Sequence, residues 1–148
     1  MRKNQLIIAL FQRFCWMDEG LQARLHDRGW PGVSRSQSMV MTNIVSGIVR
    51  PSDIARNLGI SRQAIHSTIN QMVKLGIVQL DVDPQDRRHV TLSLTDTGKM
   101  MRRDAQLAMD SLTSQISDVL GQERFDALLE SLVADWGDNI DHDNRKSA

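Results

Sequence analysis

Apolar side chains recur along this chain at helical spacing, then at the spacing of a strand, and then at helical spacing again. From residue 4 to about residue 28 they follow steps of three and four, which place them on one stripe of a helix. The run Gly29, Trp30, Pro31, Gly32 stops this pattern. A second helix is predicted to begin near Ser34 or Ser36 and to end at Gly47.

The segment 51–75 has the outline of a helix-turn-helix. Gly59 divides it into two short helices, and Ser52 and Ser61 are predicted to cap their first turns. Glycine suits a turn with positive φ, and Ala55 leaves room where the two helices would touch.

Beyond Gly76 the period of the pattern falls to two. Apolar residues at 78, 80 and 82, and again at 90, 92 and 94, alternate with polar ones, which predicts two strands. The residues between the strands are rich in turn formers and end in Arg87 and Arg88. We therefore expect a hairpin with a charged tip.

Helical spacing returns at Thr95 and lasts to Gly121, and apolar positions from Phe125 to Trp136 indicate one more amphipathic helix. The predicted fold class is mainly α with a small β-hairpin, that is, a winged helix-turn-helix with additional helices at both ends. We predict a single domain over residues 1–148. It would consist of a DNA-binding lobe at 33–98, a helical dimerisation lobe formed by 1–30 and 99–137, and a flexible tail at 138–148.

The helices at the two ends of the chain have more apolar surface than a small core can cover. Their apolar faces need a partner, and the common solution is a two-fold homodimer in which the end helices of both copies interleave. The alternative is that these helices pack only on their own domain.

Charge is distributed unevenly along the chain. The 18 basic and 18 acidic residues cancel in total, but residues 50–103 hold nine basic and five acidic groups, a local charge of +4. Because phosphate attraction depends on the local field, this block is compatible with nucleic-acid binding. The single cysteine, Cys15, excludes an internal disulfide and fits a reducing compartment. With no secretory or membrane-spanning pattern, we expect a cytoplasmic protein with no membrane contact.

The second helix of a helix-turn-helix lies in the major groove, so one face must be apolar and the other must offer hydrogen-bonding groups. Ile65, Ile69 and Met72 supply the first face. Arginine and glutamine fit the edges of guanine and adenine, whereas serine and lysine suit phosphates. The candidate DNA-binding residues of this helix are Ser61, Arg62, Gln63, His66, Ser67, Asn70 and Lys74, with Arg62, Gln63, His66 and Ser67 nearest the bases. The alternative is a polar face that only meets water.

A cation at the tip of a hairpin can enter a narrow minor groove, where the negative potential is concentrated, and Arg87 and Arg88 are placed for this contact. The sequence around them, Asp86-Arg87-Arg88 followed by Leu94-Thr95-Asp96-Thr97-Gly98, resembles the wing signature of the multiple-antibiotic-resistance regulator (MarR) family. The segments 58–61 and 75–78 also resemble that family. The similarity covers about residues 36–98.

The resemblance implies a homodimeric winged helix that binds a pseudo-palindromic operator, represses transcription and is released by a small ligand or by oxidation. Arg88 would then be the minor-groove arginine, Asp86 the acidic residue that supports the wing, Thr95 the N-cap of the long helix, and Gly98 a site of close packing. One departure is the first wing strand, where relatives often carry arginines and this chain does not. Asp81 and Asp83 also lower the positive potential there.

The resemblance also implies a pocket for a regulatory ligand between the first two helices and the long fifth helix. Candidates to line such a pocket for an aromatic carboxylate are Arg13, Trp16, His26, Trp30 and Met39, although the same residues could serve ordinary packing. Cys15 lies in the region where peroxide-sensing relatives keep a reactive thiol, but this chain has no tyrosine to bond an oxidised sulfur. A small buried hydrophobe is therefore the favoured reading of Cys15. The four histidines, 26, 66, 89 and 142, are too scattered to predict a metal site.

No nucleophile paired with a base, phosphate-binding glycine loop or ligand cluster stands out, so we expect neither an enzyme nor a cofactor. Double-stranded DNA and a second copy of the chain are the expected partners. The alternative function is a winged helix that docks a protein partner and does not bind DNA.

Overall fold

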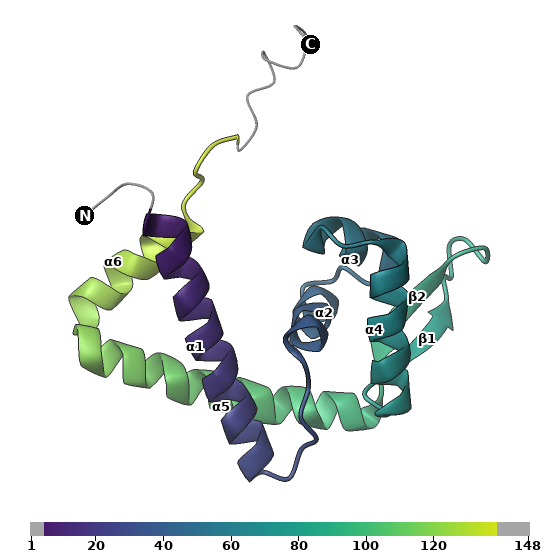
Figure 1. Cartoon of the computed structure of the whole chain (residues 1–148), viewed down its shortest axis with the longest axis horizontal. Coiled ribbons are helices and arrows are strands. Elements are labelled where there is room, and N and C mark those ends of the chain that lie inside the picture. The colour runs from purple at the N-terminus through teal and green to yellow at the C-terminus, as the bar shows by residue number, and fades with distance from the viewer. Residues whose placement is uncertain (1–4, 139–148) are drawn as a thin grey trace, which may run out of the picture. The chain divides into compact units, whose positions relative to one another are not determined.

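The computed structural model describes residues 5–138, which form six helices and one two-stranded antiparallel sheet (Figure 1). The predicted fold class, mainly α with a small hairpin, is confirmed. In order, the elements are α1 (Leu6–Asp27), α2 (Arg35–Val45), α3 (Pro51–Leu58), α4 (Arg62–Lys74), β1 (Val78–Val82), β2 (Val90–Leu94), α5 (Asp96–Leu120) and α6 (Gln122–Val133). Of the predicted flexible tail, residues 139–148 lie outside the described residues.

The chain divides into two compact units, and the division falls within α5 between Leu112 and Thr113. The first unit contains α1 to α4, the hairpin and most of α5, and the second contains the end of α5 and α6. The lobes that we inferred from the sequence stay a prediction. Within residues 5–138, no helix combines the length and the apolarity needed to cross a membrane.

The helix boundaries follow local capping chemistry. Ser34, one of the two predicted starts of α2, accepts the backbone N–H of Gln37, whose side chain in turn accepts the N–H of Ser34. Ser61 Oγ accepts the N–H of Ala64 at 3.1 Å and so caps α4. The predicted cap at Ser52 is wrong. Helix α3 begins at Pro51, whose missing N–H and fixed φ suit the first helical position.

The helix-turn-helix has the geometry that the sequence predicted. Gly59 ends α3 with φ +65°, in the left-handed region that glycine adopts without strain. Helix α3 packs on α4, and both contact the hairpin or α2. The inner face of α4 is fully buried through Ile65, Ile69 and Met72. These side chains share one core with residues of the other elements of the first unit, among them Val40, Ile54, Ile77, Val78 and Leu92.

The hairpin is buried at one end and exposed at the other. Its register pairs Val78 with Leu94 and Val82 with Val90. Val78 and Leu94 belong to the core, whereas Val82 and Val90 are exposed. The alternating pattern in the sequence therefore marks strands of which only the inner half is covered, and the outer half projects as a wing beyond α4 (Figure 1).

The junction between the wing and α5 is tight. Gly98 lies so close to the preceding segment that a β-carbon built on it would stand 2.0 Å from the carbonyl oxygen of Ile77. Thr95 Oγ1 accepts the N–H of Gly98 at 3.0 Å, and its single hydroxyl hydrogen is shared between the carbonyl oxygens of Gly76 and Ile77. The expected roles of Thr95 as a cap and of Gly98 as a packing site are therefore present.

In the second unit, α6 buries Phe125 and exposes Leu128, Leu129 and Leu132. The prediction that this helix reaches Trp136 is wrong by three residues. The helix ends at Val133, and the indole of Trp136 instead donates its N–H to the carbonyl oxygen of Ser131 at 2.7 Å.

Candidate nucleic-acid interface

The outer face of α4 is a continuous polar surface. All seven residues that the sequence assigned to it are exposed: Ser61, Arg62, Gln63, His66, Ser67, Asn70 and Lys74. Arg62 and Gln63 occupy the first turn, next to the free N–H groups at the helix N-terminus. Since the opposite face is locked into the core by three buried side chains, α4 presents these groups on a rigid support.

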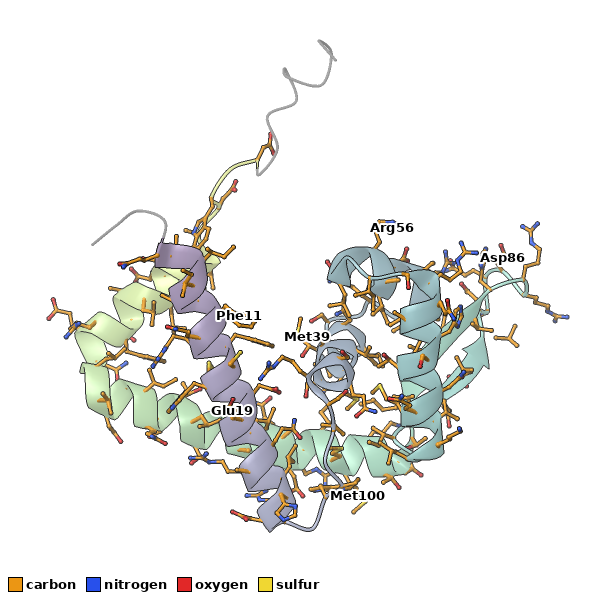
Figure 2. The ribbon with its side chains drawn as sticks, viewed as in Figure 1. Phe11, Glu19, Met39, Arg56, Asp86 and Met100 are labelled. Atoms are coloured by element: carbon orange, nitrogen blue, oxygen red, sulfur yellow. The ribbon has the colours of Figure 1, made fainter. Side chains whose placement is uncertain are left out.

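The tip of the wing presents a second cationic group. The Asp86 carboxylate accepts the N–H of Arg88 at 3.1 Å and its guanidinium Nε and Nη2 at 3.1 and 3.2 Å. The side chain of Arg88 is nevertheless 88% exposed, and Arg87 is exposed beside it. Figure 2 shows Asp86 on the loop at the end of the hairpin. The loop therefore holds Arg88 in place without covering it.

The Asp86 carboxylate is suited to this role. Hydrogen bonds from the Arg88 side chain and backbone hold the pKa of Asp86 below its usual range. The His89 ring lies 3.5 Å from the same carboxylate. Asp86 therefore keeps its negative charge at neutral pH and continues to orient Arg88.

A third feature, an ion pair at the outer end of β1, was not predicted from the sequence. Arg50 donates through Nε and Nη2 to Asp83 Oδ2, at 3.1 and 2.5 Å. Asp83 is 5% exposed, and its other oxygen accepts the N–H of Gln85 at 2.9 Å. The Gln85 N–H and the Arg50 guanidinium hold the pKa of Asp83 below its usual range. Asp83 was expected to lower the positive potential of the wing, but here Arg50 balances its charge.

A cleft of about 330 Å³ lies in the first unit, among α1, α2 and α5. Its walls are largely apolar and include Phe14, Leu21, Met39 and Met101. Of the five candidate pocket residues, only Met39 lines the cleft, from the side of α2 that faces α1 (Figure 2). Arg102 lines the cleft and supplies a cation, the role that was predicted for Arg13.

The other four candidate pocket residues lie elsewhere. Arg13, Trp16 and His26 are exposed on α1. Trp30 is half-buried, and its indole N–H donates to Asp104 Oδ2 at 2.7 Å, while Arg28 contacts Oδ1 at 3.0 Å. The pKa of Asp104 is lowered mainly by the Trp30 bond. Trp30 therefore ties the loop after α1 to α5.

Metal-ligating side chains do not cluster in the part of the chain that the structure describes. No group of three or more histidine, cysteine, aspartate or glutamate residues gathers there. Cys15 is half-buried on α1 with a free thiol. His142, the fourth histidine, lies outside the described residues.

Comparison with known proteins connects this geometry to transcriptional regulators. The sequence model of the MarR family matches residues 32–89. No curated protein matches the chain. The structure is similar to that of wild-type apo MarR from E. coli, at 21% identity, with 90% of this chain and 98% of that chain covered and a TM-score of 0.68.

Two further solved structures have the same fold. The transcriptional regulator PA4135 is 20% identical, with 97% of each chain covered and a TM-score of 0.68. The S. aureus MepR–DNA complex is 14% identical, with 87% of this chain and 93% of that chain covered and a TM-score of 0.60. The chain thus shares its winged-helix fold with proteins that include one solved on DNA.

Proposed function

We propose that this chain, whose residues 32–89 match the MarR family model, is a regulator of that family that binds duplex DNA as a homodimer and represses transcription at a pseudo-palindromic operator. One observation carries the proposal. Within a single unit, a rigid helix exposes a polar face and a projecting loop exposes an arginine held by a carboxylate. In a winged helix the first would meet base edges in the major groove and the second the minor groove.

The test is selection of genomic fragments bound by the full chain, followed by footprinting at fixed salt. We expect enrichment of a site whose two halves lie about one helical turn apart, because a two-fold dimer presents two copies of α4. Absence of enrichment even at low ionic strength would overturn the proposal. It would favour the alternative, a winged helix that docks a protein partner.

Replacing Arg62 or Gln63 by alanine is expected to relax base preference more than it lowers affinity for random duplex. The reason is that forked side chains at the start of a recognition helix read base edges, whereas phosphate contacts are indifferent to sequence. Repeating the selection with each variant measures the change. Lys74→Ala is the matched control, because a lysine in the last turn is expected to contact phosphate and to weaken all sequences alike. Equal loss on every sequence for Arg62 and Gln63 would show that they touch only the backbone.

Removing the exposed arginine of the wing, Arg88→Ala, is expected to weaken operator binding by about tenfold or more. A cation in a narrow minor groove gains from the concentrated negative potential there. Fluorescence anisotropy at one fixed salt concentration measures the loss. Arg88→Lys keeps the charge but lacks the guanidinium nitrogens that donate to Asp86. We expect its affinity to lie between those of Arg88→Ala and the unchanged chain. Unchanged affinity for Arg88→Ala would remove the wing from the interface.

The homodimer is supported by apolar surface on α1 and on α6, each considered within its own unit. The first turns of α1 expose Leu6, Ile7, Ile8 and Phe11. The exposed apolar residues of α6 include Leu128, Leu129, Leu132 and Val133. Contiguous apolar patches of this kind mark protein interfaces, and a second copy of the same chain is the partner that symmetry favours.

A small aromatic carboxylate is the effector class that we propose for the cleft among α1, α2 and α5. Its apolar walls would cover a ring, and Arg102 would meet a carboxylate. We expect millimolar benzoate to raise the unfolding temperature and to weaken operator binding. Met39→Trp, which fills the cleft, should abolish both effects, whereas Met100→Trp, on the exposed side of α5 (Figure 2), should not. Equal responses of both variants would exclude the cleft as the binding site.

A further inference from the structure

We propose that Arg50 is a positioning residue for DNA binding. Through Asp83 it fixes the outer end of β1, where the tip loop begins, to the start of α3, so that Arg88 and α4 meet the duplex in a constant relative position. This inference rests on the proposed function, because it concerns how the two DNA-contacting elements are aligned. Its physical part, the attachment of the wing, can also be tested without DNA.

The attachment consists of a backbone bond and a side-chain ion pair, which come from neighbouring residues. The N–H of Leu92 in β2 donates to the carbonyl oxygen of Val49 at 2.8 Å. The next residue, Arg50, is the N-cap of α3 and donates two hydrogen bonds to Asp83 Oδ2. The segment between α2 and α3 therefore holds the wing at the middle of β2 and at the first residue after β1.

Asp83 connects this attachment to the wing tip. Its N–H donates to the carbonyl oxygen of His89 at 2.9 Å, and its Oδ1 accepts the N–H of Gln85 at the same distance. The N–H of His89 donates to the carbonyl oxygen of Asp86, whose side chain holds Arg88. A continuous set of hydrogen bonds thus leads from the start of α3, through a buried carboxylate, to the arginine of the tip.

The hydrogen bonds also indicate that Arg50 acts through Asp83. Two of its guanidinium nitrogens, Nε and Nη2, donate to one buried carboxylate oxygen, and two bonds from one planar group restrict its direction more than a single bond would. A hairpin joined to the core only by its inner half is expected to move at its outer half. The ion pair restrains that outer half where β1 ends.

The sign of the effect of Asp83→Asn separates this proposal from simple electrostatics. Removing a negative charge close to DNA should tighten binding if the charge acts only through the field. If Asp83 positions the wing, the same change weakens operator binding, by about fivefold to tenfold. Asp81→Asn is the matched control, because it removes the same charge from the same hairpin without touching Arg50. We expect unchanged or tighter binding for Asp81→Asn. Tighter binding for Asp83→Asn would overturn the proposal.

A double-mutant cycle tests whether Arg50 acts through the wing arginine. Arg50→Ala alone should weaken binding, but in the Arg88→Ala background it should add less than about a twofold loss, since the position of a missing arginine no longer matters. If the affinity losses of the two single variants instead multiply in the double variant, and the salt dependence of the affinity falls by about one phosphate contact, Arg50 contacts DNA directly. Arg56→Ala, an exposed cation on the same helix that contacts only Asp53 among the described side chains, controls for lost charge (Figure 2).

Amide hydrogen exchange of the free protein separates failure of this inference from failure of the proposed function. In Arg50→Ala, the amides of Gln85, His89 and Leu92 should exchange about tenfold faster, while that of Ile69 in α4 should be unchanged. Unchanged exchange rates of the wing amides would contradict the proposed attachment even if the protein binds DNA. If the wing exchanges faster but the chain binds no DNA, the attachment by Arg50 is confirmed and its proposed role in DNA binding is wrong.

Discussion

Adding one methyl group at residue 98 is expected to destabilise the chain more than any other single change considered in the first unit. In Gly98→Ala the new β-carbon would stand 2.0 Å from the Ile77 carbonyl oxygen and 3.0 Å from its carbon. Both atoms belong to the backbone, so neither can rotate away. The first turn of α5 must therefore shift away from the segment between α4 and β1, at a cost of about 3 kcal/mol. For a chain of this length we expect the unfolding temperature to fall by about 10 °C.

Gly32→Ala is the matched control for this prediction. A β-carbon at Gly32 has no neighbour within 4 Å, and the residue does not occupy the left-handed region. Its substitution should leave stability unchanged or raise it slightly, because alanine restricts the unfolded chain. Chemical denaturation of both variants, followed by circular dichroism, gives the comparison. Equal stability of the two would mean that the close approach of Gly98 and Ile77 relaxes without cost.

Gly98 also illustrates how much of the fold the sequence could predict. The periodicity of apolar residues, the capping residues and the turn formers are local signals. They were sufficient to predict the boundaries of six helices and the hairpin to within a few residues. The close packing at Gly98 was predicted from the resemblance to the MarR family and not from the hydrophobic pattern. The residues around a glycine in a helix do not show which distant segment packs against it. Ser52 shows the opposite case, in which two local signals compete. Pro51 takes the first helical position, and the serine beside it is left one residue inside the helix.

Features that join distant parts of the chain were not predictable. Arg50 and Asp83 are 33 residues apart, and nothing in the composition of either segment pairs them. The same limit applies to the cleft. The sequence predicted a pocket among the three helices that line the cleft, but it could not tell which side of α1 faces α2. The prediction therefore named Arg13 and Trp16, which are exposed, and did not name Arg102 on α5, which lines the cleft.

The polar residues of α4 and the wing were easier to identify, because exposure and chemistry coincide there. A recognition helix needs one buried and one polar face, and that requirement alone selects Arg62, Gln63 and their neighbours. Their exposure in the structure follows from the burial of Ile65, Ile69 and Met72 on the opposite face. What could not be predicted was the support of these groups: the sequence named the residues proposed to meet DNA, but not the ion pair between Arg50 and Asp83 at the outer end of β1.

A charge on the apolar face of α6 is expected to have the largest effect on DNA binding. Leu132 is 44% exposed in the single chain, so Leu132→Glu should be tolerated by the monomer. In a homodimer that uses this face, the carboxylate would be buried without a partner, and the dimer should dissociate. A monomer holds only one half-site at a time. Losing the second, linked binding event should weaken operator binding by about a hundredfold or more.

Ala127→Glu provides the matched control for this prediction. Ala127 is exposed on the same helix but lies about half a turn away from Leu128, Leu129 and Leu132, so the same charge is added outside the apolar face. Sedimentation equilibrium and anisotropy on the selected operator report mass and affinity for both variants. We expect Ala127→Glu to remain dimeric with nearly unchanged affinity. If Leu132→Glu also remains dimeric, this face of α6 is not the interface; if it becomes monomeric and still binds with full affinity, a single winged helix is sufficient for operator recognition.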